Sequence, residues 1–154
     1  MSSSHLSKDI CLQTISFLKN SIDDSVTPGV SIPEFEIKKG HDSKIEDYVL
    51  HCINSLQLEN ITIKYSLYLI RKLLIKNQDL RLTHKNVFKI FFISVYISSK
   101  LNEDITYSHE RFARIGCFGR KVLSVMEEKY LELMDYNIMT LNDTESYFLF
   151  EREL

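Results

Sequence analysis

The chain has 154 residues, 44% of them hydrophobic, so it is long enough to bury the core of one domain. Its 19 lysines and arginines nearly balance its 21 aspartates and glutamates, and the net charge of −2 argues against a nucleic-acid-binding protein, which needs a basic face. The scarcity of glycine (4) and proline (2) favours an all-α fold, and three widely spaced cysteines without a CxxC motif argue against disulfides and structural zinc.

Residues 1–40 are predicted to form an N-terminal helix and a linker. The helix is expected over Ser7–Ile22, because apolar residues recur there at spacings of three to five. They are Leu6, Ile10, Ile15, Leu18 and Ile22. Such an amphipathic helix should dock on its own domain or on a partner. The prolines of the segment 21–33 indicate a connection, the charged residues 34–42 are expected to be irregular, and the compact domain is expected over 41–154.

Two amphipathic helices are predicted next, at about Ser43–Leu56 and Thr62–Lys76. The inward face of the first comprises Ile45, Val49, Cys52, Ile53 and Leu56, and that of the second comprises Ser66, Leu69, Ile70, Leu73 and Leu74. The residues of each face recur at helical spacing, so each helix should pack one side against a common core.

The stretch Leu82–Leu101 is the most apolar part of the chain. From Val87 to Ile97 only Lys89 and Ser94 are not apolar, and a helix apolar on nearly every side belongs among other helices. A buried strand would also give an apolar run, but strands of this kind usually end after about 8 residues. The stretch is too short for a membrane span, which needs about 20 apolar residues. We therefore predict a central helix with Thr83 as its N-cap and Lys100 in its last turn.

Three helical segments are predicted after the central helix. They are a short one at about Ser108–Ile115, which ends at Gly116, one at about Gly119–Met134, and a final one that opens at Asn142. Leu123, Met126, Tyr130 and Leu133 or Met134 face inward from the second of them. Asn142 and Glu145 stand at the spacing of a capping box.

No group of residues in the sequence indicates catalysis, a cofactor or a small-molecule substrate. His51 and Cys52 are adjacent, so on a helix they point in different directions rather than at each other. The chain contains neither a P-loop nor a G-x-G-x-x-G motif, and His84 and His109 have no partner at metal-ligand spacing. The N-terminus has no apolar signal segment, which favours a location inside the cell, in the cytoplasm or the nucleus, without a membrane partner.

An ordered set of motifs in this chain resembles the cyclin box. Leu82-Thr83, Asn86 and the run SSKLNED at 98–104 resemble L-T-x-x-N followed by A-S-K-F-x-D-D. The run YSHERFARIG at 107–116 resembles the Y-S-N-x-x-[YF]-A-K-[VI]-G-G segment of P/U-type cyclins, the phosphate-signalling group. Leu123, Met126-Glu127, Tyr130-Leu131 and residues 136–138 resemble L-x-x-L-E-x-x-F-L-x-x-L-x-F-x-L. The resemblance covers about residues 43–150 and implies five helices, the third surrounded by the other four.

The resemblance also implies a function, the binding and activation of a cyclin-dependent protein kinase. In the family, a lysine that ends the third helix and a glutamate on the fifth form a polar pair that contacts the kinase near its C-helix. The positions that match the family's kinase contacts are Lys100, Glu127, Ile97, Leu101, Leu131 and Ile138. A kinase needs its C-helix glutamate paired with the lysine that aligns the ATP phosphates, so a partner that grips this helix favours the active state. For Ile97, Leu101 and Leu131 a place in the internal core is a competing alternative.

The chain departs from the family pattern at several positions. An internal arginine–aspartate pair of most cyclin boxes is replaced by His51 and Ile70, and losing both partners together avoids an unpaired buried charge. The motif that docks substrate peptides in some cyclins is not recognisable at 50–54, and Cys117 stands where the family has glycine. The alternative function is a cyclin-fold interaction adaptor, of the transcription type or another, without kinase activation. A helical enzyme is supported only by unremarkable carboxylates.

Overall fold

Helices account for nearly all regular structure in the computed structural model, which describes residues 3–24, 29–37, 44–138 and 143–154, with side chains from residue 9 onward. The helices are α1 (Ser3–Ser21), α2 (Ile45–Leu56), α3 (Asn60–Lys76), α4 (Val87–Asn102), α5 (His109–Ile115), α6 (Arg120–Leu133) and α7 (Asp143–Glu153), with a 3₁₀ helix η1 at Pro33–Phe35. No strand lies within these ranges, where one isolated bridge pairs Ile22 with Leu82. The all-α prediction is confirmed.

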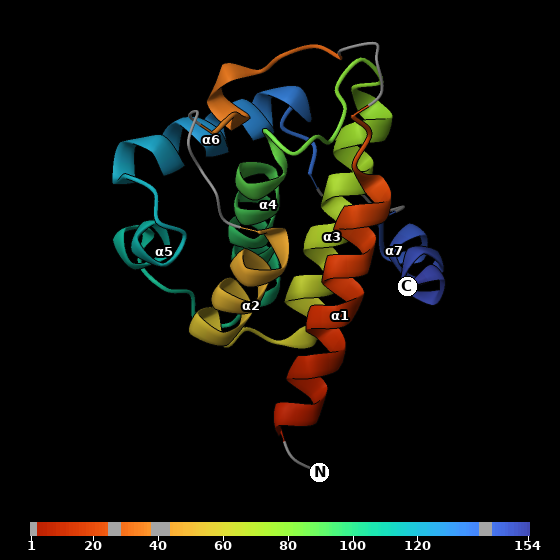
Figure 1. Cartoon of the computed structure of the whole chain (residues 1–154), viewed down its shortest axis with the longest axis vertical. Coiled ribbons are helices and arrows are strands. Elements are labelled where there is room, and N and C mark those ends of the chain that lie inside the picture. The colour runs from red at the N-terminus through yellow and green to blue at the C-terminus, as the bar shows by residue number, and fades with distance from the viewer. Residues whose placement is uncertain (1–2, 25–28, 38–43, 139–142) are drawn as a thin grey trace.

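Helix α4 is the centre of the fold, as predicted. Every residue from Val87 to Ser99 except Lys89 is buried, so the helix needs neighbours on all sides. Figure 1 shows α4 enclosed behind α2, with α3 on one side and α5 on the other, and it also packs against α6. The small side chain of Ser98 lies where α3 and α4 meet, and its hydroxyl donates to the Thr62 carbonyl at 2.6 Å.

The predicted N-terminus of the central helix is wrong by one turn. The helix begins at Val87 with Asn86 as its N-cap residue, rather than just after Thr83. The residues between form a turn, in which the Thr83 amide donates to Asn86 Oδ1 at 2.8 Å and the Lys85 amide donates to Thr83 Oγ1 at 3.2 Å. The Thr83 hydroxyl therefore stabilises a turn that precedes the helix.

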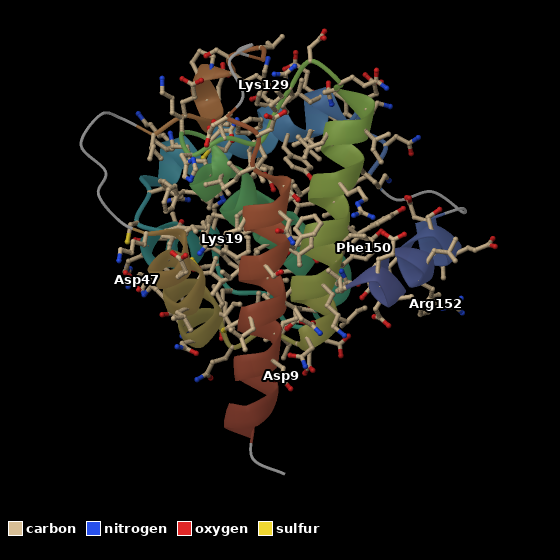
Figure 2. The ribbon with its side chains drawn as sticks, turned by 45° about the vertical axis from the view of Figure 1, so that its right-hand side comes forward. Asp9, Lys19, Asp47, Lys129, Phe150 and Arg152 are labelled. Carbon is tan, nitrogen blue, oxygen red and sulfur yellow. The ribbon has the colours of Figure 1, made fainter. Side chains whose placement is uncertain are left out.

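Helix α1 packs on α2 and α3 and contributes to the same hydrophobic core as helices α2 to α6. Its buried face is Ile10, Cys11, Thr14 and Leu18, while the predicted contribution of Leu6 lies outside the described side chains. Figure 2 shows Lys19 on the side of α1 next to α2, where it forms an ion pair with Glu46. In the segment expected to be irregular, η1 places the fully buried Phe35 against Tyr130 of α6.

The remaining helices agree with the predicted segments to within a few residues. Ser108 caps α5, because its hydroxyl accepts a hydrogen bond from the Arg111 amide at 3.2 Å. Helix α7 packs on α3, and Figure 2 shows Phe150 between these helices while Arg152 points away. The predicted cap residue Asn142, the predicted domain start at His41 and the predicted helix start at Ser43 lie outside the described residues.

Candidate functional site

Lys100 and Glu127 form an ion pair at the surface, where the last turn of α4 lies close to the middle of α6. Lys100 Nζ lies 2.6 Å from Glu127 Oε2. The side chains are 46% and 24% exposed, so both charged groups also reach solvent. The two residues that the sequence predicts as a polar pair, 27 positions apart, are thus brought together by the fold.

Tyr96 lies beneath this pair and was not singled out from the sequence. The Lys100 ammonium is 4.3 Å from the centroid of the Tyr96 ring, within the range of a cation–π interaction. Burial lowers the pKa of Lys100, but hydrogen bonding and charge interactions with Glu127 and Tyr96 outweigh this effect and raise that pKa. The spacing of Tyr96 and Lys100, one helical turn, is the sequence signal that could have indicated their contact.

The apolar positions predicted around the pair differ in what they offer to another molecule. Leu101 is 37% exposed and follows Lys100 directly. Leu131 is partly buried and lies one turn after Glu127 on α6, on the same side of that helix. Ile97 is only 4% exposed and belongs to the core, so it presents almost no surface to a partner.

Ile138 lies toward the opposite end of α3 from the last turn of α4. Its carbonyl accepts a hydrogen bond from Lys72 Nζ at 3.1 Å, whereas Ser98 near the end of α4 faces Thr62 at the beginning of α3. At 1.5 Å per residue, Lys72 is about 15 Å along α3 from Thr62. A surface that included both Lys100 and Ile138 would therefore extend along much of the bundle.

The two side chains that replace the family's internal charge pair, His51 and Ile70, are accommodated without buried charges. Ile70 is fully buried in the core, and His51 Nε2 lies 2.8 Å from the carbonyl oxygen of Ile115. Burial raises the pKa of the adjacent Cys52 to about 12, so its thiol stays protonated at neutral pH. Cys52 is therefore an unreactive core residue rather than a nucleophile.

Metal-ligand groups and membrane spans are both missing from the part of the chain that the structure describes. No three histidine, cysteine, aspartate or glutamate side chains gather there in a way that could hold a metal ion. The described helices are also either too short or too polar to cross a membrane. What remains as the candidate site is the exposed ion pair with its apolar neighbours, a combination of charge and apolar surface that suits contact with another protein.

Comparison with known proteins identifies similarity over most of the chain. The family model described as Cyclin matches residues 19–138, which include α2 to α6 and the candidate site. Cyclin-U2-1 of Arabidopsis thaliana is 31% identical over 72 residues, which make up 46% of this chain and 32% of that protein. The chain thus matches about a third of the length of this relative.

Proposed function

Because this chain belongs to the cyclin family, with a cyclin box of the P/U type, we propose that it is a regulatory subunit that binds a cyclin-dependent protein kinase and positions the kinase C-helix. The observation that carries the proposal is the exposed Lys100–Glu127 pair, beside the exposed Leu101. Members of this family are regulatory proteins, so we assign the candidate site a role in binding.

The chemistry of the pair suits the end of a helix in a partner. An ammonium carries three hydrogen-bond donors, which match the unpaired carbonyls at a helix C-terminus, and a carboxylate accepts from the unpaired amides at an N-terminus. Since Lys100 and Glu127 already hold each other in place, less side-chain freedom is lost when a partner binds them. Leu101 and Leu131 would add apolar area to this contact.

Binding and activation can be measured with a panel of purified cyclin-dependent kinases. We expect the chain to bind at least one of them and to raise its phosphorylation of a peptide substrate. The double variant Lys100→Ala/Glu127→Ala should reduce both effects more than tenfold, because a charged contact in the centre of an interface is commonly worth more than 1.4 kcal/mol. Its circular dichroism spectrum should be unchanged, since an exposed ion pair contributes about 1 kcal/mol or less to stability.

A second exposed ion pair provides the matched control. Lys76 Nζ lies 3.1 Å from Asp135 Oδ2 near the other end of α3, so Lys76→Ala/Asp135→Ala removes the same charges elsewhere. This control should bind and activate like the unmodified chain. Normal kinase binding by the Lys100/Glu127 double variant would refute the assigned site. If the unmodified chain bound a kinase without changing its activity, the adaptor function would be favoured.

A further inference from the structure

Tyr96 is one member of a chain of contacts that links the ion pair to α5. Tyr96 is 4% exposed, and its ring lies under the Lys100 ammonium and packs on Phe112 with a centroid distance of 4.9 Å. Its hydroxyl oxygen is 2.8 Å from His109 Nδ1, at the beginning of α5. The far side of the imidazole reaches α6, where Nε2 is 3.0 Å from the carbonyl oxygen of Arg120 and 3.0 Å from Ser124 Oγ.

The hydrogen-bonding capacities of these groups assign the protons. A carbonyl oxygen only accepts, so the contact with Arg120 requires that His109 Nε2 carries the hydrogen. Neutral His109 then has a bare Nδ1, which accepts the hydroxyl hydrogen of Tyr96. The Tyr96 ring is therefore oriented by its hydroxyl group and is packed on its face, so it has little freedom to move away from Lys100.

This arrangement braces the two helices that carry the ion pair. Tyr96 and Lys100 are one turn apart on α4, while Arg120 and Glu127 are two turns apart on α6. His109 spans the space between the two helices by holding Tyr96 at one nitrogen and the first turn of α6 at the other.

We infer that Tyr96 is a positioning residue for Lys100 and that His109 locks Tyr96 in place, so that the ammonium is presented to a partner in one fixed geometry. The role in partner binding rests on the proposed function, whereas the placement of Lys100 is a property of the free chain. Tyr96→Leu should release the Lys100 side chain, and Tyr96→Phe should retain most of its placement because the ring remains.

The first measurement is the NMR signal of the Lys100 Cε methylene group in the free chain, assigned with a Lys100→Arg variant. An aromatic face next to this group shifts its protons upfield, and we expect Tyr96→Leu to abolish the shift while Tyr96→Phe keeps it. Tyr107→Leu is the matched control, because the Tyr107 ring also lies 4.3 Å from a cation, in that case the guanidinium of Arg111. An unchanged Lys100 signal in Tyr96→Leu would overturn the inference.

The second measurement is affinity for whichever kinase of the purified panel binds the unmodified chain. Tyr96→Leu should weaken binding about two- to tenfold, Tyr96→Phe should restore most of the loss, and Tyr107→Leu should have no effect. Equal loss in the leucine and phenylalanine variants would contradict a role for the ring. If no kinase binds the unmodified chain, the proposed function fails, and the NMR comparison still decides whether Tyr96 places Lys100.

Discussion

Lys72 on α3 and Asp143 at the beginning of α7 form the least exposed ion pair among the described residues, with Nζ 2.9 Å from Oδ2. The Asp143 carboxylate also accepts the Tyr68 hydroxyl at 2.6 Å, and the Lys72 ammonium also donates to the Ile138 carbonyl. These contacts tie Ile138, in the connection between α6 and α7, and the first residue of α7 to α3. The pair is therefore expected to fix where the last helix docks.

Removal of one partner of this pair should destabilise the protein. Lys72→Ala leaves the Asp143 carboxylate buried without its cation, at a cost of about 2–4 kcal/mol in the free energy of unfolding. Urea unfolding followed by circular dichroism measures this change. Lys76→Ala breaks the more exposed pair with Asp135 and should cost less than about 1 kcal/mol. Similar losses in the two variants would show that burial of the pair is unimportant.

Gly116 is required where α5 ends against α4. A Cβ atom at this position would lie 2.4 Å from Phe92 Cζ, and the Phe92 ring is fully buried and cannot retreat. Gly116→Ala should therefore cost about 1–3 kcal/mol through overpacking. At Gly119 the nearest atom to an added Cβ is 3.8 Å away, so there is room for a methyl group. Gly119→Ala should lower the free energy of unfolding by only about 0.5–1 kcal/mol, because alanine is a weaker N-cap residue than glycine. Thermal unfolding of both variants tests this difference, and an equal loss would contradict the steric explanation.

Much of the fold could be predicted because its signals are local. The boundaries of α2, α3, α5 and α6 follow from helical periodicity and from stop and cap residues such as Gly116 and Ser108. Phe35 stands among charged residues without any period, and its burial follows from the packing of η1 on α6, where it meets Tyr130, and on α4. The first turn expected for α4 was lost to hydrogen bonds between Thr83 and Asn86, a local competition that helix propensity does not describe.

In the candidate site, too, some residues could be predicted from the sequence and others depend on tertiary packing. Lys100 and Glu127 could be named because they match a motif, whereas nothing in the sequence indicates that His109 meets Tyr96 and the Arg120 carbonyl. This contact depends on how α5 packs between α4 and α6. The burial of Ile97 also depends on packing, because nearly every position from Val87 to Ile97 is apolar and the sequence does not show which of them stay exposed.

Cys117 adopts a backbone conformation that favours glycine, with a φ of 63°. A side chain costs about 1 kcal/mol in this left-handed region, and the matching position in P/U-type cyclins is a glycine. Cys117 is exposed, so little packing is lost on its removal. We expect Cys117→Gly to raise the free energy of unfolding by about 0.5–1 kcal/mol in urea unfolding. Ser55→Gly is the control, because Ser55 lies inside α2, where glycine is unfavourable. This change should lower the free energy of unfolding by about 1 kcal/mol.

Tyr65 is a buried tyrosine whose hydroxyl oxygen has no hydrogen-bond partner among the described residues. Tyr65→Phe removes this unsatisfied group and should stabilise the protein by about 1 kcal/mol at neutral pH. Tyr68→Phe should instead cost about 1–2 kcal/mol, because the Tyr68 hydroxyl donates to Asp143. If Tyr65→Phe lowered the stability as much as Tyr68→Phe does, the Tyr65 hydroxyl would not be an unsatisfied group.

Tyr65 should also make stability depend on alkaline pH. Burial, with a smaller effect from the charge of Asp143, raises the pKa of Tyr65 to about 12, whereas a tyrosine in the unfolded chain has a pKa of about 10. Above pH 10 the unfolded chain releases this proton more readily, so the free energy of unfolding should fall between about pH 10 and pH 12. Urea unfolding across this range should show a shallower fall for Tyr65→Phe. An identical pH dependence would refute the contribution of Tyr65.

Helix α1 is expected to be an integral part of the domain rather than an appendage. Leu18 is fully buried in the core that α1 shares with α2 and α3, so Leu18→Ala should lower the free energy of unfolding by about 2–5 kcal/mol. Leu12 lies on the same helix and is exposed, so Leu12→Ala should change that free energy by less than about 0.5 kcal/mol. Urea unfolding of both variants should give single transitions. If Leu18→Ala and a deletion of residues 1–40 both left stability and kinase binding unchanged, α1 would contribute nothing to the domain.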